Sequence, residues 1–269
     1  MRTVGRHRAF PVSLIGRYLR FNLAAAIEYR TAFLVQVFGM ALNNSAFIFF
    51  WLILFERIGS DIRGYEFSDV MFVWAIVASG FGLAVVVMGN ASQISRIVYT
   101  GELDVYLLQP KTVLPNVLFS RMVVSGIGDF LYGIVLFVAT HPVTARNVAL
   151  FVVFVALVAT LMTAMRVLYH SFTFFFGNAE AFALTASDLA VSFVLYPGSI
   201  FRGPAVWLLH SLVPAALMGY IPVALFREFD PVRFVLLILA DGAIVVIAIA
   251  AFHLGLRRYE SGNRIGTRT

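Results

Sequence analysis

The sequence predicts an all-α integral membrane protein with six transmembrane helices, an N-terminal interfacial amphipathic helix and a re-entrant helical hairpin between spans 5 and 6. The 269-residue chain is 61% hydrophobic and only 13% charged, with a mean hydropathy of +0.89. Soluble domains are nearer half apolar and a quarter charged. Uncharged runs such as 31–55 and 70–95 are long enough to cross a hydrocarbon layer of about 30 Å.

The first 30 residues are basic and predict a cytoplasmic or interfacial segment. Beyond residue 10 the apolar and polar positions alternate at helical spacing, with Arg17 and Arg20 on the polar face. We expect a helix that lies on the inner leaflet and directs these arginines toward lipid phosphates. A disordered basic tail is the alternative, because Pro11 and two glycines interrupt the segment.

Six apolar runs give the expected transmembrane domain at 31–256. The spans are expected at 31–55, 70–89, 116–140, 147–176, 178–196 and 232–256. Five of the nine prolines divide 197–231 into short apolar pieces, which predicts an outer re-entrant hairpin rather than a seventh span. The distribution of Lys and Arg favours this topology, with both termini cytoplasmic and a cytoplasmic tail at 257–269.

Small residues four positions apart follow each other along the second span. The pairs are Ala75 with Ser79 and Ala78 with Gly82. Such pairs allow two helix backbones to approach closely, so we expect a tightly packed neighbour on this face.

A short polar stretch at 95–111 separates two long apolar runs. It carries Arg96, Glu102 and Asp104, a turn signal at Thr100-Gly101 and a helix stop at Pro110. We interpret it as a cytoplasmic loop with a short helix that lies against a soluble partner, contacted by these three charged side chains. The alternative is that they are solvated loop charges.

Several polar residues fall inside the spans and are candidates for a substrate path. They are Asn43 and Asn44 in the first span, Asp129 in the third and Asp241 in the sixth. Packing between helices is the alternative for the two asparagines.

Arg166 and Asp188 each lie 11 residues from Gly177, one before it and one after it, by the numbering of the chain. In an antiparallel hairpin that turns at Gly177 the two reach equal depth. We therefore predict an intramembrane ion pair between Arg166 and Asp188, because paired charges cost less than lone ones.

No pattern in the sequence predicts a catalytic, cofactor-binding or metal site. The single lysine, Lys111, follows Pro110, so a phosphate-cradling loop of the form G-x-x-x-x-G-K-[ST] is absent from the sequence. The chain has no cysteine, which excludes disulfides and thiolate metal sites. The net charge of +6 is scattered around the spans and makes no basic stripe, so we expect no nucleic-acid binding.

Three stretches resemble the permease subunits of ABC-2-type ATP-binding-cassette transporters. They are GELDVYLLQPKTVLPNVLFSR at 101–121, YPGSIFRGPAVWLLHSLVPAALMGYIPVALF at 196–226 and LRRYESGN at 256–263. The six-span layout and the basic N-terminal helix match as well, so the resemblance covers nearly the whole chain.

The resemblance implies a subunit of an exporter in the cell membrane. Two permease subunits, identical or different, would form the pathway, and two separately encoded ATPase subunits would bind ATP and Mg²⁺ and dock from the cytoplasm. The loop at 91–111 would carry a coupling helix at 91–107, and the N-terminal helix with Arg17 and Arg20 would pack near it. The hairpin at 203–226 would cap the pathway. Substrate, direction and the identity of the second permease are left open.

Two other classes of function compete with this one. An ion-coupled secondary transporter would use Asp129, Asp188 and Asp241, because ionisable groups inside spans are functional candidates. A non-transporting assembly or receptor subunit is the third class. An ATPase that co-purifies with the chain favours the first reading, and transport by the chain alone favours the second.

Overall fold

Four long apolar helices dominate the computed structural model, which describes residues 13–28, 30–59, 61–62, 64–201, 203 and 214–260. Over this part of the chain every regular element is a helix, and one isolated bridge joins Ile62 to Tyr65. The helices long and apolar enough to span a membrane lie within 30–58, 67–99, 145–176 and 231–256. The structure is therefore that of an all-helical membrane protein.

The described helices follow the expected order along the chain, with extra short ones between spans 2 and 3. They are α1 (Ser13–Glu28), α2 (Arg30–Ile58), α3 (Phe67–Met88), η1 (Gly89–Gln93), α4 (Ile94–Tyr99), α5 (Leu103–Leu107), α6 (Val113–Phe119), α7 (Gly126–Thr140), α8 (Ala145–Ser171), α9 (Thr173–Phe176), α10 (Glu180–Val194), η2 (Gly198–Ile200), η3 (Ala216–Tyr220), α12 (Ile221–Arg227) and α13 (Pro231–Leu256).

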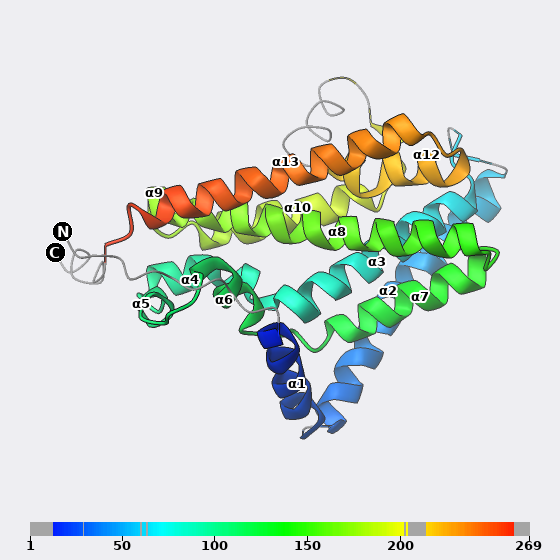
Figure 1. The fold of residues 1–269 in the computed structure, drawn as a ribbon. Helices are drawn as coiled ribbons and strands as arrows, with labels where there is room; N and C mark the ends of the chain where they lie inside the picture. Colours follow the sequence, from blue (N-terminus) through cyan, green and yellow to red (C-terminus); the bar gives the residue numbers. More distant parts are fainter. Residues whose placement is uncertain are drawn as a thin grey trace.

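Helix α3 is the centre of the bundle and is buried over most of its length. It packs against α7 and α8, while α10 and α13 pack on α8 (Figure 1). Helices α4, α5 and α9 lie at one end of the bundle, here called the α5 end. Helix α12 and the loop between α2 and α3 lie at the opposite end, here called the α12 end (Figure 1).

Close backbone contact joins α3 to α7 and confirms the expectation drawn from the small residues of α3. A Cβ atom at Gly82 would meet backbone atoms of Gly126 and Phe130. A Cβ atom at Gly133 would meet Ser79 and the carbonyl oxygen of Ala75. Without side chains between them the two backbones gain van der Waals contact that larger residues would prevent.

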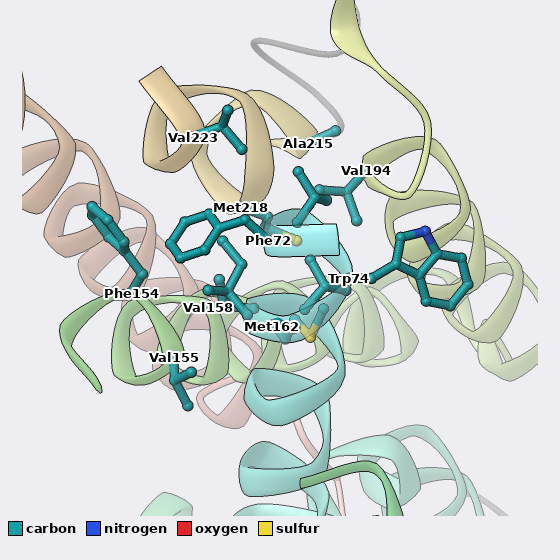
Figure 2. Packing of buried hydrophobic residues seen from close by; sticks show 14 of the residues in the cluster. Phe72, Trp74, Phe154, Val155, Val158, Met162, Val194, Ala215, Met218 and Val223 are labelled. Carbon is teal, nitrogen blue, oxygen red and sulfur yellow. The ribbon is translucent and has the colours of Figure 1, made fainter. Parts of the chain in front are cut away.

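Aromatic side chains fill the core near the α12 end. The rings of Phe72 and Phe226 stack with centroids 3.9 Å apart, and those of Phe137 and Phe151 lie 4.3 Å apart. Figure 2 shows Phe72 in close packing with Met218, and Phe154 and Val158 close by. This cluster therefore connects α12 and η3 to the two central helices α3 and α8.

The third expected span, 116–140, is not one helix. Helix α6 ends at Phe119 and α7 begins at Gly126, so the expectation of a continuous helix is wrong. In the intervening segment the Val123 amide donates a hydrogen bond to the Val85 carbonyl oxygen of α3 at 2.9 Å. This tertiary bond replaces a helical one. It also places Asp129 in the first turn of α7 rather than deep within a span.

The segment expected as a re-entrant hairpin is described only in part. Residues 204–213 lie outside the described residues, so the first limb stays a prediction. The second limb is η3 followed by α12, where Pro222, Val223 and Leu225 are buried. Both elements are helical and pack against α3 and α8, and the re-entrant course of the segment stays a prediction.

Candidate functional site

Three short helices, η1, α4 and α5, occupy the expected coupling region at 91–107. Gly101 separates α4 from α5 with φ +79°, a left-handed conformation that glycine adopts without steric cost. The turn signal at Thr100-Gly101 is thereby confirmed. The region is a compact block of short helices rather than one continuous coupling helix.

Asn90 holds this block to the following helix. Its side-chain amide donates to the Ser120 hydroxyl at 2.8 Å and to the Val117 carbonyl oxygen at 3.0 Å. The hydroxyls of Tyr106 and Ser120 lie 3.1 Å apart and extend the network to α5. Buried polar groups that are satisfied in this way fix the relative positions of the elements that carry them.

A second hydrophobic cluster fastens the block to two long helices. Ile94, Ile97 and Leu103 of the block are buried together with Val167 of α8 and Phe252 of α13. Ser95 adds a polar contact, since its hydroxyl lies 2.8 Å from Nδ1 of His170 on α8. The block is therefore packed directly against α8 and α13.

The opposite side of the block presents charged and apolar side chains to solvent. Arg96 and Glu102 lie 4.0 Å apart, and about half of each side chain is exposed. Asp104 is half-buried and lies beside Tyr259 of the C-terminal segment. Burial and the neighbouring Asp104 carboxylate raise the pKa of Tyr259 to about 12. Arg96 and Glu102 are thus presented outward, whereas Asp104 contacts its own chain.

Helix α1 contacts α6, the helix that follows the block, through Tyr18. The Tyr18 hydroxyl donates to Oδ1 of Asn116 on α6 at 3.0 Å, and Lys111 lies 5.8 Å from the Tyr18 ring centroid. Arg17 and Arg20 are both exposed on α1. The helix therefore packs against α6, and its two arginines are exposed.

Two of the polar residues expected to line a path lie in contact. The Asn44 side-chain amide of α2 donates to Oδ1 of Asp129 on α7 at 2.7 Å, and both line a cavity together with Asn43. Asp241 is buried on α13, and its Oδ1 atom has no hydrogen-bond partner within the described chain. It does not line that cavity. The structure thus brings three of the four residues together and places the fourth elsewhere.

Arg166 and Asp188 lie on the neighbouring helices α8 and α10. Across the described residues no hydrogen bond or ion pair within 4.0 Å joins the two side chains, although the charge of Asp188 acts on Arg166. The Arg166 guanidinium instead lies 4.9 Å from the centroid of the Phe81 ring. The ion pair stays a prediction.

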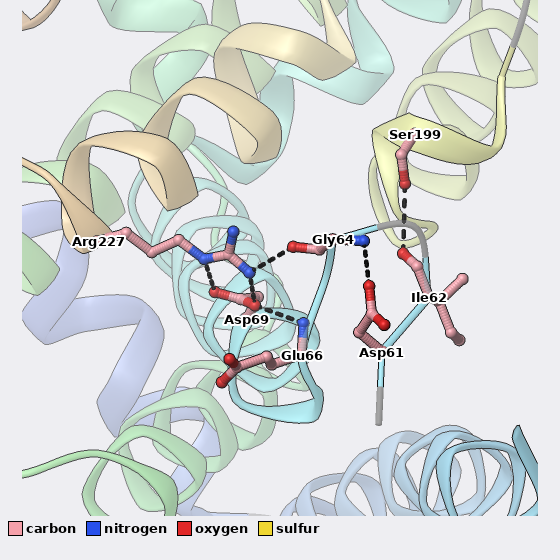
Figure 3. Close-up of polar contacts among 7 residues, drawn as sticks. All are labelled: Asp61, Ile62, Gly64, Glu66, Asp69, Ser199 and Arg227. Atoms are coloured by element: carbon pink, nitrogen blue, oxygen red, sulfur yellow. Dashed lines mark hydrogen bonds and ion pairs between the residues drawn. The ribbon is translucent and has the colours of Figure 1, made fainter. Parts of the chain in front are cut away.

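A charged cluster at the α12 end was not foreseen from the sequence. Figure 3 shows Arg227, at the end of α12, donating to both carboxylate oxygens of Asp69 in the first turn of α3. Arg227 also donates to the Gly64 carbonyl oxygen at 2.8 Å, and the Glu66 amide donates to Asp69 at 2.6 Å. The hydrogen bond with Asp69 raises the pKa of Arg227.

The two charges of this cluster are separated by 158 positions in the sequence. Neither charge alone indicates a site, because Asp69 lies in the first turn of α3 and Arg227 in the last turn of α12, where such charges are common. Their pairing joins α12 to α3 and to the loop before it. The local signal that could have found this place is the spacing of Glu66 and Asp69, which form a capping box.

Long apolar helices with a block of short helices at one end define an integral membrane protein of the multi-span class. A family model described as "ABC-2 family transporter protein" matches residues 41–263. The chain therefore belongs to the ABC-2 family of transporter proteins. No curated protein and no solved structure matches it.

Proposed function

We propose that this chain is one of two permease subunits of an ATP-driven exporter and that separate ATPase subunits dock on the block at 91–107. Membership of the family implies association with ATPase subunits. The observation that carries the proposal is the double attachment of the block, by the Asn90 network and by the cluster around Ile97 and Phe252. A push on such a block would move α8 and α13 as rigid bodies.

The exposed side of the block has the chemistry of a docking surface. Leu108 is 87% exposed and Val105 61%, next to the charged pair of Arg96 and Glu102. Apolar side chains surrounded by charge on one small surface are typical of protein contact sites. An ATPase bound here would hydrolyse ATP with Mg²⁺ in its own site.

The proposed arrangement uses the transmembrane unit at 31–256 in six crossings. Helices α7 and α10 would be the two crossings besides the four long helices. The α5 end and both termini would face the cytoplasm, and the segment at 197–231 would lie outside. A second permease subunit, identical or different, would pack along α2, where Leu34, Phe38 and Phe49 are exposed.

Charge reversal tests the docking surface. Glu102→Lys and the double variant Glu102→Lys/Asp104→Lys are expected to lower co-purification of the ATPase and its stimulation while membrane insertion is unchanged. The matched control, Glu56→Lys/Glu228→Lys, reverses two exposed carboxylates near the α12 end and should retain the ATPase. Unchanged ATPase binding and transport in the Glu102 variants would remove the proposal.

An ion-coupled transporter is the second candidate, because Asp129 and Asp241 are buried and each has a carboxylate oxygen without a partner within the described chain. Reconstituted vesicles that contain this chain alone distinguish the two. Substrate movement driven by a proton gradient supports the second candidate, and movement only with ATP and the ATPase supports the first.

A further inference from the structure

A cavity of about 180 Å³ lies between α2, α3, α7 and α10. Its walls are mostly apolar, with polar side chains contributed by α2, α3 and α7. The lining residues are Met40, Asn43, Asn44, Phe47, Trp74, Val77, Ala78, Phe81, Asp129, Val191 and Leu195. Asp129 is the one charged residue in this lining.

Two polar atoms of the lining lack a hydrogen-bond partner within the described chain. They are Oδ2 of Asp129 and Nε1 of Trp74, and both residues are only 3% exposed. The other carboxylate oxygen of Asp129 is occupied by the Asn44 amide at 2.7 Å. A buried polar atom without a partner destabilises a protein, so a ligand that supplied partners to both atoms would gain affinity from them.

The two atoms need opposite kinds of hydrogen-bond partner. Oδ2 of Asp129 accepts hydrogen bonds and, in a carboxylate, attracts a cation, whereas Nε1 of Trp74 is only a donor. A matching ligand therefore carries a cationic N–H donor and, near it, an acceptor such as a hydroxyl or carbonyl oxygen.

The walls suit the remainder of such a ligand. Trp74 lies with its ring centroid 5.2 Å from that of Phe47, and Phe81 contributes a third ring. Figure 2 shows the Trp74 side chain pointing away from the packed group around Phe72 and Met218. Aromatic faces attract cations, and an apolar cavity of about 150 Å³ is known to hold a benzene ring.

We infer that this cavity binds a protonated primary or secondary amine with a neighbouring hydrogen-bond acceptor and an apolar body, as in an aromatic amino alcohol. The ammonium group would donate to Oδ2 of Asp129 while the acceptor takes the Trp74 N–H. The assignment of such amines as transported substrates rests on the proposed function as a permease. Binding itself does not.

Calorimetric titration of the full-length permease in lipid nanodiscs tests the site. The probes are phenylethanolamine, its neutral isostere styrene glycol, and the quaternary trimethylammonium derivative, which has no N–H donor. We expect phenylethanolamine to bind about tenfold or more tightly than either comparison compound, because charge-assisted hydrogen bonds contribute that much. Equal affinity for the amine and the glycol, or for the amine and the quaternary ammonium compound, would overturn the inference.

Asp129→Asn should remove the preference for the amine, whereas Asp241→Asn, a buried carboxylate outside this cavity, should retain it. A preference that survives Asp129→Asn would overturn the site. If Asp129→Asn does not insert, the selectivity of the unchanged protein still decides. Stimulation of ATP hydrolysis by phenylethanolamine in the complete complex is measured separately. Binding without stimulation would count against the proposed function and leave the site standing.

Discussion

The two ends of the bundle are held together by different kinds of interaction. At the α5 end, neutral hydrogen bonds from Asn90 join the block to α6, and a mainly aliphatic cluster joins it to α8 and α13. At the α12 end, a charged pair and stacked aromatic rings join segments far apart, such as Asp69 and Arg227. Buried neutral bonds of this kind fix the position of the block relative to α6. A charged pair with one exposed partner joins separate helices and can be exchanged for water.

The difference indicates where each end changes during transport. The block at the α5 end is expected to move without deforming, because its interactions lie mainly within itself and with α8 and α13. The α12 end is expected to open by separation of α12 from α3, because the Arg227 side chain is 43% exposed and water can replace its contacts.

Removal of the charge at Arg227 should have the largest effect on stability. Arg227→Gln leaves the Asp69 side chain, which is 8% exposed, without its cation. We expect a loss of about 2 kcal/mol, below the value for a fully buried pair because Arg227 is partly in water. Thermal unfolding in detergent measures it. Arg233→Gln, which breaks a more exposed pair with Asp230, is the control, and an equal loss in both variants would contradict the distinction.

Asn90→Ala is expected to have a smaller effect on stability and a larger one on coupling. The carbonyl oxygen of Val117 keeps its bond from the Ser120 hydroxyl at 2.8 Å, so the loss should be about 1 kcal/mol. Because the block is then less firmly held to α6, ATP hydrolysis should continue while transport per ATP falls. Parallel measurement of hydrolysis and transport checks this, and an unchanged ratio would show that the network does not maintain coupling.

The pH dependence of stability should reflect the packing of His141 at the α12 end. His141 follows α7 and lies against Phe72, Phe137 and Phe226. Burial lowers the pKa of His141 from 6.5, so the neutral form is favoured in the folded state. Its contribution is complete above about pH 6.5 and is lost as the pH falls through the lower folded pKa. Comparison of the melting temperature with that of His141→Phe between pH 7 and pH 5 measures the effect, which should vanish in the variant.

Arg96→Ala should have the smallest effect on stability. Its ion pair with Glu102 is exposed and 4.0 Å long, so the expected loss is below about 0.5 kcal/mol. ATPase docking should nevertheless weaken, because Arg96 belongs to the proposed contact surface. Retained ATPase binding with lowered thermal stability would reverse both expectations and assign Arg96 a structural role.

The sequence predicted the long helices well, because α2, α3, α8 and α13 depend on long apolar runs that any helix of sufficient length must satisfy. It did not predict the break before α7, which depends on a bond from Val123 to Val85. Asn44 and Asp129 were each identified as polar residues in apolar spans, but their contact depends on how α2 packs on α7. Pairing across helices is a property of the packed bundle, and one sequence carries no direct signal for it.

The sidedness of the block tests the central claim most directly. The chain contains no cysteine, so Glu102→Cys provides a single site for a membrane-impermeant maleimide, with Glu228→Cys as the control at the α12 end. We predict that Cys at position 102 reacts in inverted vesicles and not in intact cells, and that position 228 shows the reverse. Labelling of position 102 from outside intact cells would place the block beyond the reach of a cytoplasmic ATPase and contradict the account.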